Sequence, residues 1–364
     1  MTICPVCDSL QSEIVYVETL PLSTWTSGGT ETGDINIALC RSCGHMWNTQ
    51  FKEQNASLIY KNQPLSNKPV TRGAMSRYEK VLEFIGVEKI LNKDIIEIGP
   101  GSGEFAVKLS EIGRHVLLFE PNDNFKVDIK NTTIINDFFE PRAKADVVIA
   151  RQVLEHAPDP VRFIRAVSES LRPGGVAYIE VPNGSEVALH GLWHDIHHPH
   201  VHYFNLRSLT MLCDKFNLKV QKINNILDNH DFGILLGRDG NINVDLKNIN
   251  PESVRENFSN SRTSFLEFSS QGEFALYGAT AVAVPLSNVG SEPKIVYDDN
   301  PELWDWKIPL IKKPAISITR PSKVLLDRIV VASYLHFDKI LEKLGKIGFS
   351  GKVFNPRYRS VFRL

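Results

Sequence analysis

The stretch Ile96-Glu97-Ile98-Gly99-Pro100-Gly101-Ser102-Gly103 decides the fold. It has the pattern of a buried strand that ends in a glycine-rich turn, and the apolar spacing of residues 104–112 predicts a helix directly after it. Glycines let the backbone turn tightly and let a ligand approach without a Cβ clash, while the helix start offers unpaired N–H groups. The third glycine comes one residue earlier than in the dinucleotide fingerprint G-x-G-x-x-G, which favours a ligand without a pyrophosphate.

Apolar runs alternate with helical patterns on both sides of this turn. The five runs are Ile95–Ile98, Val116–Phe119, Thr133–Ile135, Val147–Ala150 and Val176–Val181. Helical patterns lie between them at Glu104–Ile112 and Pro160–Leu171, and we expect Pro173-Gly174-Gly175 to close the second helix. The alternation predicts an α/β fold with a doubly wound, Rossmann-like sheet whose ligands bind beyond the carboxyl ends of the strands.

Acidic residues follow two of these predicted strands. Glu120, followed by Pro121, stands at the tip of the second strand, where a carboxylate can accept hydrogen bonds from both hydroxyls of a ribose. Asp137 follows the third strand and can accept from an adenine amino group, with Phe138 packing nearby. Together with the glycine turn, these residues predict a nucleoside-binding crevice.

Four of the five cysteines form two C-x-x-C pairs, Cys4 with Cys7 and Cys40 with Cys43. The first residues lack the pattern of a secretory signal, so we expect a reducing, cytoplasmic location in which disulfides are unfavourable. Two such pairs supply four thiolates to one tetrahedral zinc ion. We therefore predict a structural Zn²⁺ in a small amino-terminal module.

The chain of 364 residues is long enough for two or three domains. We predict a zinc-binding module over 1–60, a nucleoside-binding domain over 61–240 and a second α/β domain over 241–364. The last block contains another strand–turn–helix pattern at Phe274–Thr280. The 41 basic residues of the whole chain against its 42 acidic ones argue against a nucleic-acid partner, and no apolar run is long enough to cross a membrane.

Six of the eleven histidines fall between residues 190 and 202, after the fifth predicted strand. Imidazole is the natural general base near neutral pH, so one of them can deprotonate a substrate or orient it; His200 is the first candidate, followed by His197 and His198. Two other interpretations stay open. The alternating histidines could join Asp195 in a divalent metal site, or they could be structural and bond to backbone carbonyls.

A longer set of motifs resembles the class I methyltransferases that use S-adenosylmethionine. The resemblance runs from the glycine turn through Ala145–His156 and Leu171–Gly175 to Val181–Asn183. It implies that the turn around Glu97, Gly99, Gly101 and Gly103 cradles the methionine part of the cofactor. It also implies that Glu120 holds the ribose, that Asp137 meets the adenine, and that Arg151 and Gln152 line the methionine end.

The order of the three blocks resembles bacterial C-methyltransferases that act on nucleotide-linked sugars. Those proteins carry a Glu-His pair followed by Tyr and Phe after the fifth strand, and the corresponding run here is residues 199–204. Their histidine base corresponds to His200, but their glutamate is replaced by Pro199 and their upstream tyrosine by His197. A further tyrosine of their site corresponds to Tyr60.

We therefore expect methyl transfer to a small molecule, a nucleotide- or phosphate-linked sugar, with a histidine base. Oxygen and carbon acceptors are not separated by the sequence. The alternatives are a methyltransferase for RNA or another small molecule, and a non-catalytic scaffold that binds the cofactor.

Overall fold

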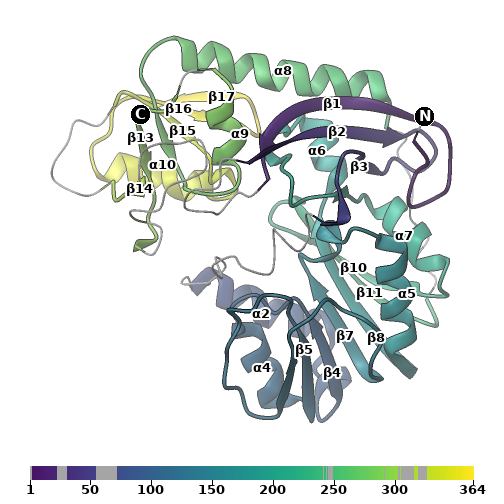
Figure 1. Ribbon diagram of the computed structural model, residues 1–364. Helices are drawn as coiled ribbons and strands as arrows, with labels where there is room; N and C mark the ends of the chain where they lie inside the picture. The colour runs from purple at the N-terminus through teal and green to yellow at the C-terminus, as the bar shows by residue number, and fades with distance from the viewer. Residues whose placement is uncertain are drawn as a thin grey trace.

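The structure is a computed structural model of the chain, and it describes residues 2–22, 31–54, 72–240, 242, 244, 249–290, 292–301, 304, 315–318 and 326–364. The described elements form three sheets with helices packed around them. Figure 1 shows the largest sheet at the bottom of the molecule, the amino-terminal strands at the upper right and the carboxyl-terminal strands at the upper left.

The central sheet has seven strands in the order β10-β11-β8-β7-β4-β5-β6. Its five parallel strands are β4 (Asp94–Ile98), β5 (His115–Phe119), β6 (Thr132–Ile135), β7 (Ala145–Arg151) and β8 (Leu171–Pro182). They coincide with the five predicted apolar runs, so the predicted doubly wound sheet is confirmed. The strands β10 (Lys219–Ile226) and β11 (Asp231–Gly237) extend it antiparallel beyond β8, which the sequence interpretation had missed.

Helices cover the two faces of this sheet. They are α2 (Arg72–Ile85), α3 (Val87–Ile90), α4 (Glu104–Ile112), α5 (Pro160–Ser170) and α7 (Leu206–Asp214), with the short 3₁₀ turn η1 (Leu154–His156). The helix α6 (Gly184–His190) and the 3₁₀ turn η2 (Trp193–Asp195) instead pack with residues of the amino- and carboxyl-terminal units. The helix α4 occupies the residues predicted for it. At the start of α5, the Asp159 side chain accepts a hydrogen bond from the Arg162 N–H at 2.9 Å, which satisfies an otherwise unpaired donor.

The connection from α5 to β8 differs from the prediction. The helix ends at Ser170 because Leu171 already pairs with Ala145 of β7. Pro173-Gly174-Gly175 therefore lies within β8, where the register against β7 shifts, and does not close the helix. Gly174 adopts a φ of 76° there, a conformation that favours glycine.

The amino-terminal sheet takes one strand from the central block. Its order is β1 (Ser12–Pro21), β2 (Thr32–Cys40), β3 (Met46–Asn48) and β9 (His202–Tyr203). In this antiparallel arrangement Met46 pairs with Tyr203 and Trp47 with His202. The histidine-rich segment is thus built into the sheet of the cysteine module.

The carboxyl-terminal block forms a second α/β unit, as predicted. Its sheet order is β14 (Ala315–Ile316), β13 (Ile295–Tyr297), β12 (Ala275–Tyr277), β15 (Arg328–Val331), β16 (Lys352–Asn355) and β17 (Ser360–Arg363). All neighbours are parallel except β16 and β17. The accompanying helical elements are α9 (Ala283–Asn288), η4 (Tyr334–His336) and α10 (Phe337–Lys346).

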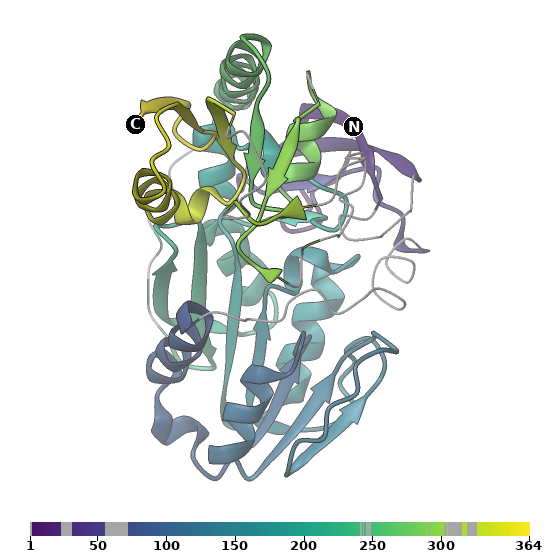
Figure 2. The same ribbon diagram turned by 90° about the vertical axis from the view of Figure 1, so that its left-hand side faces the viewer.

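The helix α8 (Pro251–Ser270) runs along the top of the molecule and spans the amino- and carboxyl-terminal units (Figure 1). It buries Phe258, Phe265 and Phe268 in a cluster that also contains Leu39, Trp193 and Leu276. Since those residues come from all three blocks, the blocks share one apolar core. Figure 2 shows both smaller units above the same end of the central sheet.

Among the helices that the structure describes, none combines the length and apolar character that a bilayer crossing requires.

Candidate active site

The glycine turn after β4 has the conformation that the sequence predicted. Gly99, Gly101 and Gly103 have φ values of 66°, 62° and 91°, which disfavour other residues. A Cβ on Gly99 would lie 2.6 Å from Cγ2 of Val153, whereas a Cβ on Gly101 would meet no atom within 4 Å. The turn therefore packs against the end of β7 at Gly99 and borders open space at Gly101.

Two buried carboxyl groups face this turn, Glu97 on β4 and Glu120 after β5. Burial raises the pKa of Glu97 to about 8, although the nearby Arg151 opposes the shift. Burial also raises the pKa of Glu120 to about 7, against hydrogen bonds from the Asn122 and Gly101 backbones. Donors on a nucleoside would compensate the cost of burying these groups.

The residues predicted to contact the adenine of the cofactor lie nearer the surface. Asp137 accepts hydrogen bonds from the Phe138 N–H at 2.9 Å and from the Arg142 guanidinium at 2.7 Å. Phe138 and Pro121 are both partly exposed. These contacts leave the predicted adenine-binding role of Asp137 and Phe138 as a prediction.

Arg151 and Gln152 extend from the carboxyl end of β7. The Arg151 guanidinium lies 5.0 Å from the Tyr78 ring centre and 4.9 Å from that of Phe105. Gln152 has a φ of 55°, a left-handed conformation that is uncommon outside glycine. The backbone strain lies next to the glycine turn, as expected for a ligand-binding edge.

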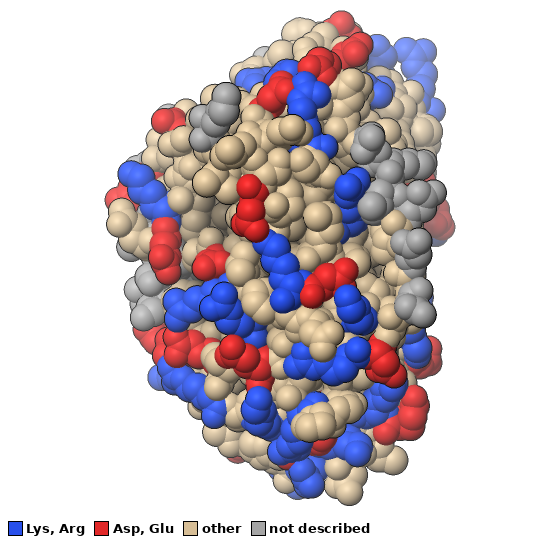
Figure 3. Space-filling view, turned by 90° about the vertical axis from the view of Figure 1, so that its right-hand side faces the viewer, with Lys and Arg blue, Asp and Glu red and all other residues tan. Residues whose placement is uncertain are grey.

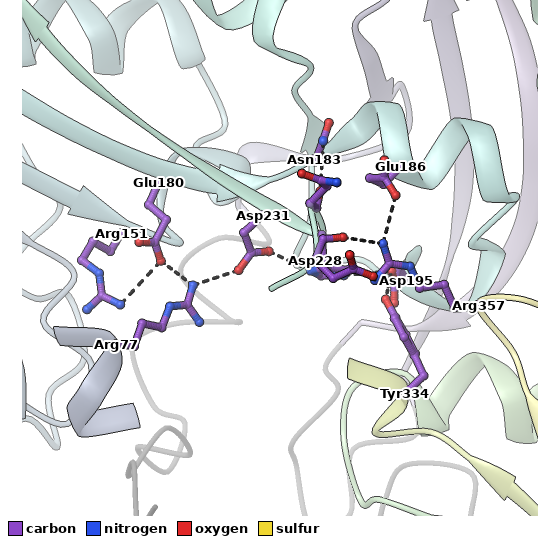
Figure 4. Close-up of polar contacts among 12 residues, drawn as sticks. Arg77, Arg151, Glu180, Asn183, Glu186, Asp195, Asp228, Asp231, Tyr334 and Arg357 are labelled. Atoms are coloured by element: carbon purple, nitrogen blue, oxygen red, sulfur yellow. Dashed lines mark hydrogen bonds and ion pairs between the residues drawn. The ribbon is translucent and has the colours of Figure 1, made fainter. Parts of the chain in front are cut away.

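A chain of charged groups crosses the carboxyl edge of the sheet (Figure 4). Arg77 of α2 contacts Glu180 of β8 and lies 2.8 Å from Asp231 of β11. His230 continues the chain, with Nδ1 2.8 Å from Asp231 and Nε2 3.2 Å from Asp195. The end of β8 and the histidine segment are thereby connected through ion pairs.

The far end of this chain reaches the carboxyl-terminal unit. The Tyr334 hydroxyl donates to Asp195, and Arg357 lies 3.0 Å from Glu186 of α6 (Figure 4). Burial by itself would lower the pKa of His230, but its hydrogen bonds to Asp195 and Asp231 raise it to about 10. His230 is therefore a cation at neutral pH, balanced by two carboxylates.

The six histidines of the predicted catalytic segment do not form one cluster. Four of them have separate partners: His190 pairs with Glu186 (3.2 Å), His194 packs on the Tyr334 ring (5.3 Å between centres), His198 Nε2 contacts the Gly33 carbonyl (2.8 Å), and His202 contacts His45 (3.1 Å). His198, which was a catalytic candidate, thus connects the segment to the amino-terminal unit.

His197 and His200 remain together, with ring centres 3.9 Å apart, and His156 joins them at 4.9 Å from His200. Burial lowers the pKa of His200 well below its usual range, and the neighbouring His197 and His156 lower it further. Burial likewise lowers the pKa of His197 to about 3. All these imidazoles are neutral near pH 7, the form that accepts a proton or a metal ion.

The four predicted metal ligands lie together. All four sulfur atoms lie within 4.8 Å of one another, with Cys4 and Cys43 3.7 Å apart and Cys7 and Cys40 3.5 Å apart. A tetrahedral zinc ion with Zn–S bonds of about 2.3 Å separates its sulfurs by about 3.8 Å. The donor set therefore fits Zn²⁺, while Cys213 is a buried thiol away from the cluster, as predicted.

The cysteine module holds the histidine segment by backbone contacts. Besides the pairing of β3 with β9, the Asn205 amide donates to the Cys43 carbonyl at 3.2 Å, and the Asn48 N–H donates to the Val201 carbonyl at 2.8 Å. The position of His200 therefore depends on the amino-terminal unit.

The predicted site residue Tyr60 lies outside the described residues, so its role stays a prediction. Other residues of the site were not predicted from the sequence. Glu155, Arg77 and His230 were missed because they belong to different segments that meet only in the fold. The one local signal was the Glu155-His156 pair directly after β7.

Comparison with known proteins defines the class. Residues 71–223 match a family model described as a methyltransferase domain. Together with the sheet order and the glycine turn, this match shows that the chain carries a class I S-adenosylmethionine-dependent methyltransferase domain, which confirms the predicted class.

One curated relative is C-methyltransferase NovU from Streptomyces niveus, which is 24% identical over 53% of this chain and 49% of that protein. Another is a ubiquinone biosynthesis O-methyltransferase from Nitrosospira multiformis, which is 25% identical over 42% of this chain and 65% of that protein. The chain thus matches about half to two thirds of the length of these relatives. A solved structure of N-methyltransferase NodS from Bradyrhizobium japonicum WM9 with S-adenosyl-L-homocysteine is 12% identical, with a TM-score of 0.38, over 47% of this chain and 93% of that one.

The surface charge is mixed on the face shown in Figure 3. Basic and acidic side chains alternate there and form no extended patch of one sign among the described residues. This distribution agrees with the formal net charge of −1 and differs from the basic face of a nucleic-acid-binding protein.

Proposed function

We propose that this chain transfers the methyl group of S-adenosylmethionine to a sugar linked to a nucleotide or a phosphate, and that His200 controls the proton of the acceptor. The observation that carries the proposal is the cluster of His156, His197 and His200. The cluster lies beyond the carboxyl end of β7, and Val153, two residues after that strand, packs against the glycine turn at Gly99.

The order of the units supports a sugar acceptor. A four-cysteine unit, a methyltransferase domain and a second α/β unit follow one another, as in the sugar C-methyltransferases that the sequence resembles. The relatives are named as C- and O-methyltransferases, which favours a small-molecule acceptor over RNA. RNA, other small molecules and a purely cofactor-binding role are the alternative outcomes of the tests below.

The reaction is an in-line displacement. The methyl carbon leaves the sulfonium and bonds to an oxygen or carbon of the acceptor, the cofactor becomes the neutral thioether S-adenosylhomocysteine, and the acceptor loses one proton. The protein therefore has to align the two reactants and make that proton labile. Glu97, Glu120 and the glycine turn would hold the cofactor, and the histidine cluster would face the acceptor.

The four-cysteine site would hold a structural Zn²⁺. Its four thiolates would complete the coordination shell, which leaves no open position for chemistry. The ion would order the loops around Cys4 and Cys43 and, through Asn205 and β9, the segment that carries His200.

The acceptor is tested by incubating the full chain with S-adenosylmethionine and a panel of nucleotide sugars, followed by mass detection of methylated products. Measurable binding of S-adenosylhomocysteine together with a methylated sugar supports the proposal. Binding without any methylated sugar, but with a methylated RNA or other small molecule, would reject the sugar assignment. Binding with no product from any acceptor class would favour the scaffold role.

The role of His200 is tested with His200→Ala. Turnover should fall by roughly 10²–10⁴-fold with unchanged affinity for S-adenosylhomocysteine. His190→Gln is the matched control, because His190 lies on α6 beside Glu186, outside the cluster. Full turnover in His200→Ala would remove this residue from the mechanism.

A further inference from the structure

A carboxylate and two imidazoles meet next to the proposed acceptor site. Glu155 and His156 belong to η1, directly after β7, and His200 comes from the histidine segment. One ligand atom from each of the three residues lies within 4.8 Å of the other two. No short-range pattern connects Glu155 with His200, because 44 residues lie between them.

The carboxylate of Glu155 has an unusual environment. The residue is 0% exposed, and neither side-chain oxygen has a hydrogen-bond partner among the described residues. The neutral imidazole of His156 lies beside it, with Nε2 3.8 Å from Oε1. Burying a carboxylate without hydrogen-bond partners is unfavourable, and a bound cation would compensate this cost.

The two segments that supply the cluster are held against each other. His156 Nδ1 lies 2.6 Å from the Pro199 carbonyl and donates to it, so Nε2 carries the ring's lone pair. The Val201 N–H also donates to the Glu155 carbonyl at 2.8 Å. A hydrogen bond from one ring nitrogen to a carbonyl is the usual way in which proteins orient a metal-binding histidine.

We propose that Glu155, His156 and His200 form a binding site for a divalent first-row transition-metal ion. Two neutral imidazoles and one carboxylate are a common donor set for such ions and leave further coordination positions open. Ligand atoms around one ion with bonds of about 2.1 Å are at most about 4.2 Å apart. Only one pair of ligand atoms can reach that separation, and in a tetrahedral shell all pairs are about 3.4 Å apart, so the three side chains would have to draw closer around the ion.

Asp195 does not take part in this site. The sequence interpretation had combined it with the alternating histidines, but its carboxylate accepts from Tyr334 and lies 3.2 Å from His230. Those partners satisfy Asp195 and leave Glu155 as the carboxylate that the cluster offers. The metal site that we propose therefore has Glu155, in place of Asp195, as its acidic ligand.

The role of the ion rests on the proposed function. An ion at this site would coordinate a hydroxyl or keto oxygen of the acceptor and acidify the hydroxyl or the carbon beside the keto group. The released proton would pass to solvent, and the methyl transfer would otherwise balance as written above. His200 would then act on the acceptor through the ion, as its ligand.

Metal binding itself is tested on the full chain without any acceptor. Elemental analysis after loading with Co²⁺ should give two metal equivalents per chain, one at the cysteines and one at this cluster. Glu155→Gln and His200→Gln should each lose one equivalent, while His190→Gln keeps both. These two variants should keep the near-ultraviolet sulfur-to-cobalt charge-transfer band of the four-cysteine site, because the ion they lose has no sulfur ligand.

A single equivalent in the unaltered chain, or two in Glu155→Gln, would overturn the site. The catalytic role is judged separately in the mass assay. If the chain binds the second ion but methylates no sugar, the proposed function fails and the site stands. If Glu155→Gln methylates at the full rate, the ion has no part in the reaction, and the catalytic part of the inference fails.

Discussion

The cofactor edge and the histidine cluster lie side by side, but they are built in different ways. The cofactor edge comes from one strand and its turn, with Glu120 added from the neighbouring strand tip, and it borders open space at Gly101. The histidine cluster joins η1 to a segment that the cysteine module holds through β3, Asn48 and Asn205. One site depends on local backbone geometry, whereas the other depends on the packing of distant units.

This difference leads us to expect that changes at the two sites have different consequences. A change in the amino-terminal unit should affect the acceptor side and spare the cofactor, and a change at the strand tips should do the reverse. The following variants test whether the cofactor side and the acceptor side respond separately, beginning with the largest expected effect.

Cys40→Ser is expected to have the largest effect, because a structural zinc site contributes on the order of 10 kcal/mol to the folding of its module. Methyl transfer should fall more than about 10²-fold, while affinity for S-adenosylhomocysteine changes by less than about threefold. Hydrogen exchange should increase over residues 197–204 as well as over 2–22. Unchanged exchange over 197–204 would show that the cysteine module does not hold the histidine segment.

Glu120→Ala should weaken the binding of S-adenosylhomocysteine by about tenfold or more, since a charge-assisted hydrogen bond contributes roughly 1.5–3 kcal/mol. Calorimetric titration measures this change. In the unaltered chain the affinity should rise with pH through about 7, because burial raises the pKa of Glu120 to about 7 and hydroxyl donors favour its ionised form. Metal content should be the same as in the unaltered chain, and a loss of metal would contradict the separation.

Gly101→Ala and Gly99→Ala form a matched pair with similar φ values of 62° and 66°. Each should incur a backbone cost of about 1–2 kcal/mol, but only the second adds a clash with Val153. We expect Gly101→Ala to weaken cofactor binding a few-fold and to lower the melting temperature by its backbone cost alone, and Gly99→Ala to lower the melting temperature further. Equal melting temperatures for the two variants would contradict the packing of Gly99 against β7.

His230→Gln is expected to change the pH dependence of unfolding and to leave cofactor binding least affected. The folded-state pKa of His230 is about 10, above its ordinary value of 6.5. Its contribution to stability is therefore complete below pH 6.5 and is lost as the pH rises through about 10. The unaltered chain should lose up to about 1.4 kcal/mol per pH unit more than the variant in that window. Parallel denaturation curves would show that His230 is not charged in the fold.

The sequence predicted the cofactor edge because its signals are local. Gly99, Gly101 and Gly103 follow an apolar run, and Glu120 stands directly after the next strand, so neighbouring residues determine both the backbone and the role. The same reasoning located the four cysteines, whose spacing encodes their function. Strands β10 and β11 were missed because an antiparallel addition leaves no crossover pattern.

The acceptor side was predicted only in part, for a physical reason. The position of the six histidines after the fifth strand predicted that they lie at one edge of the sheet, although their alternation already excluded a single site for all six. Partners such as Gly33, His45 and Tyr334 separate four of them. Glu155 joined the site only through its contact with the Val201 backbone. Such groupings follow from tertiary packing, which no short spacing in the chain records.

The shared apolar core has a practical consequence for dissecting the protein. Because Leu39, Trp193 and Leu276 pack in one cluster with the phenylalanines of α8, the boundaries drawn along the sequence are not places where the polypeptide can be cut without damage. A fragment ending near residue 240 would expose to water the apolar residues of the first two units that α8 and the carboxyl-terminal unit cover. We expect this fragment to precipitate. Swapping acceptor preference between related enzymes would accordingly require transplanting all three units together.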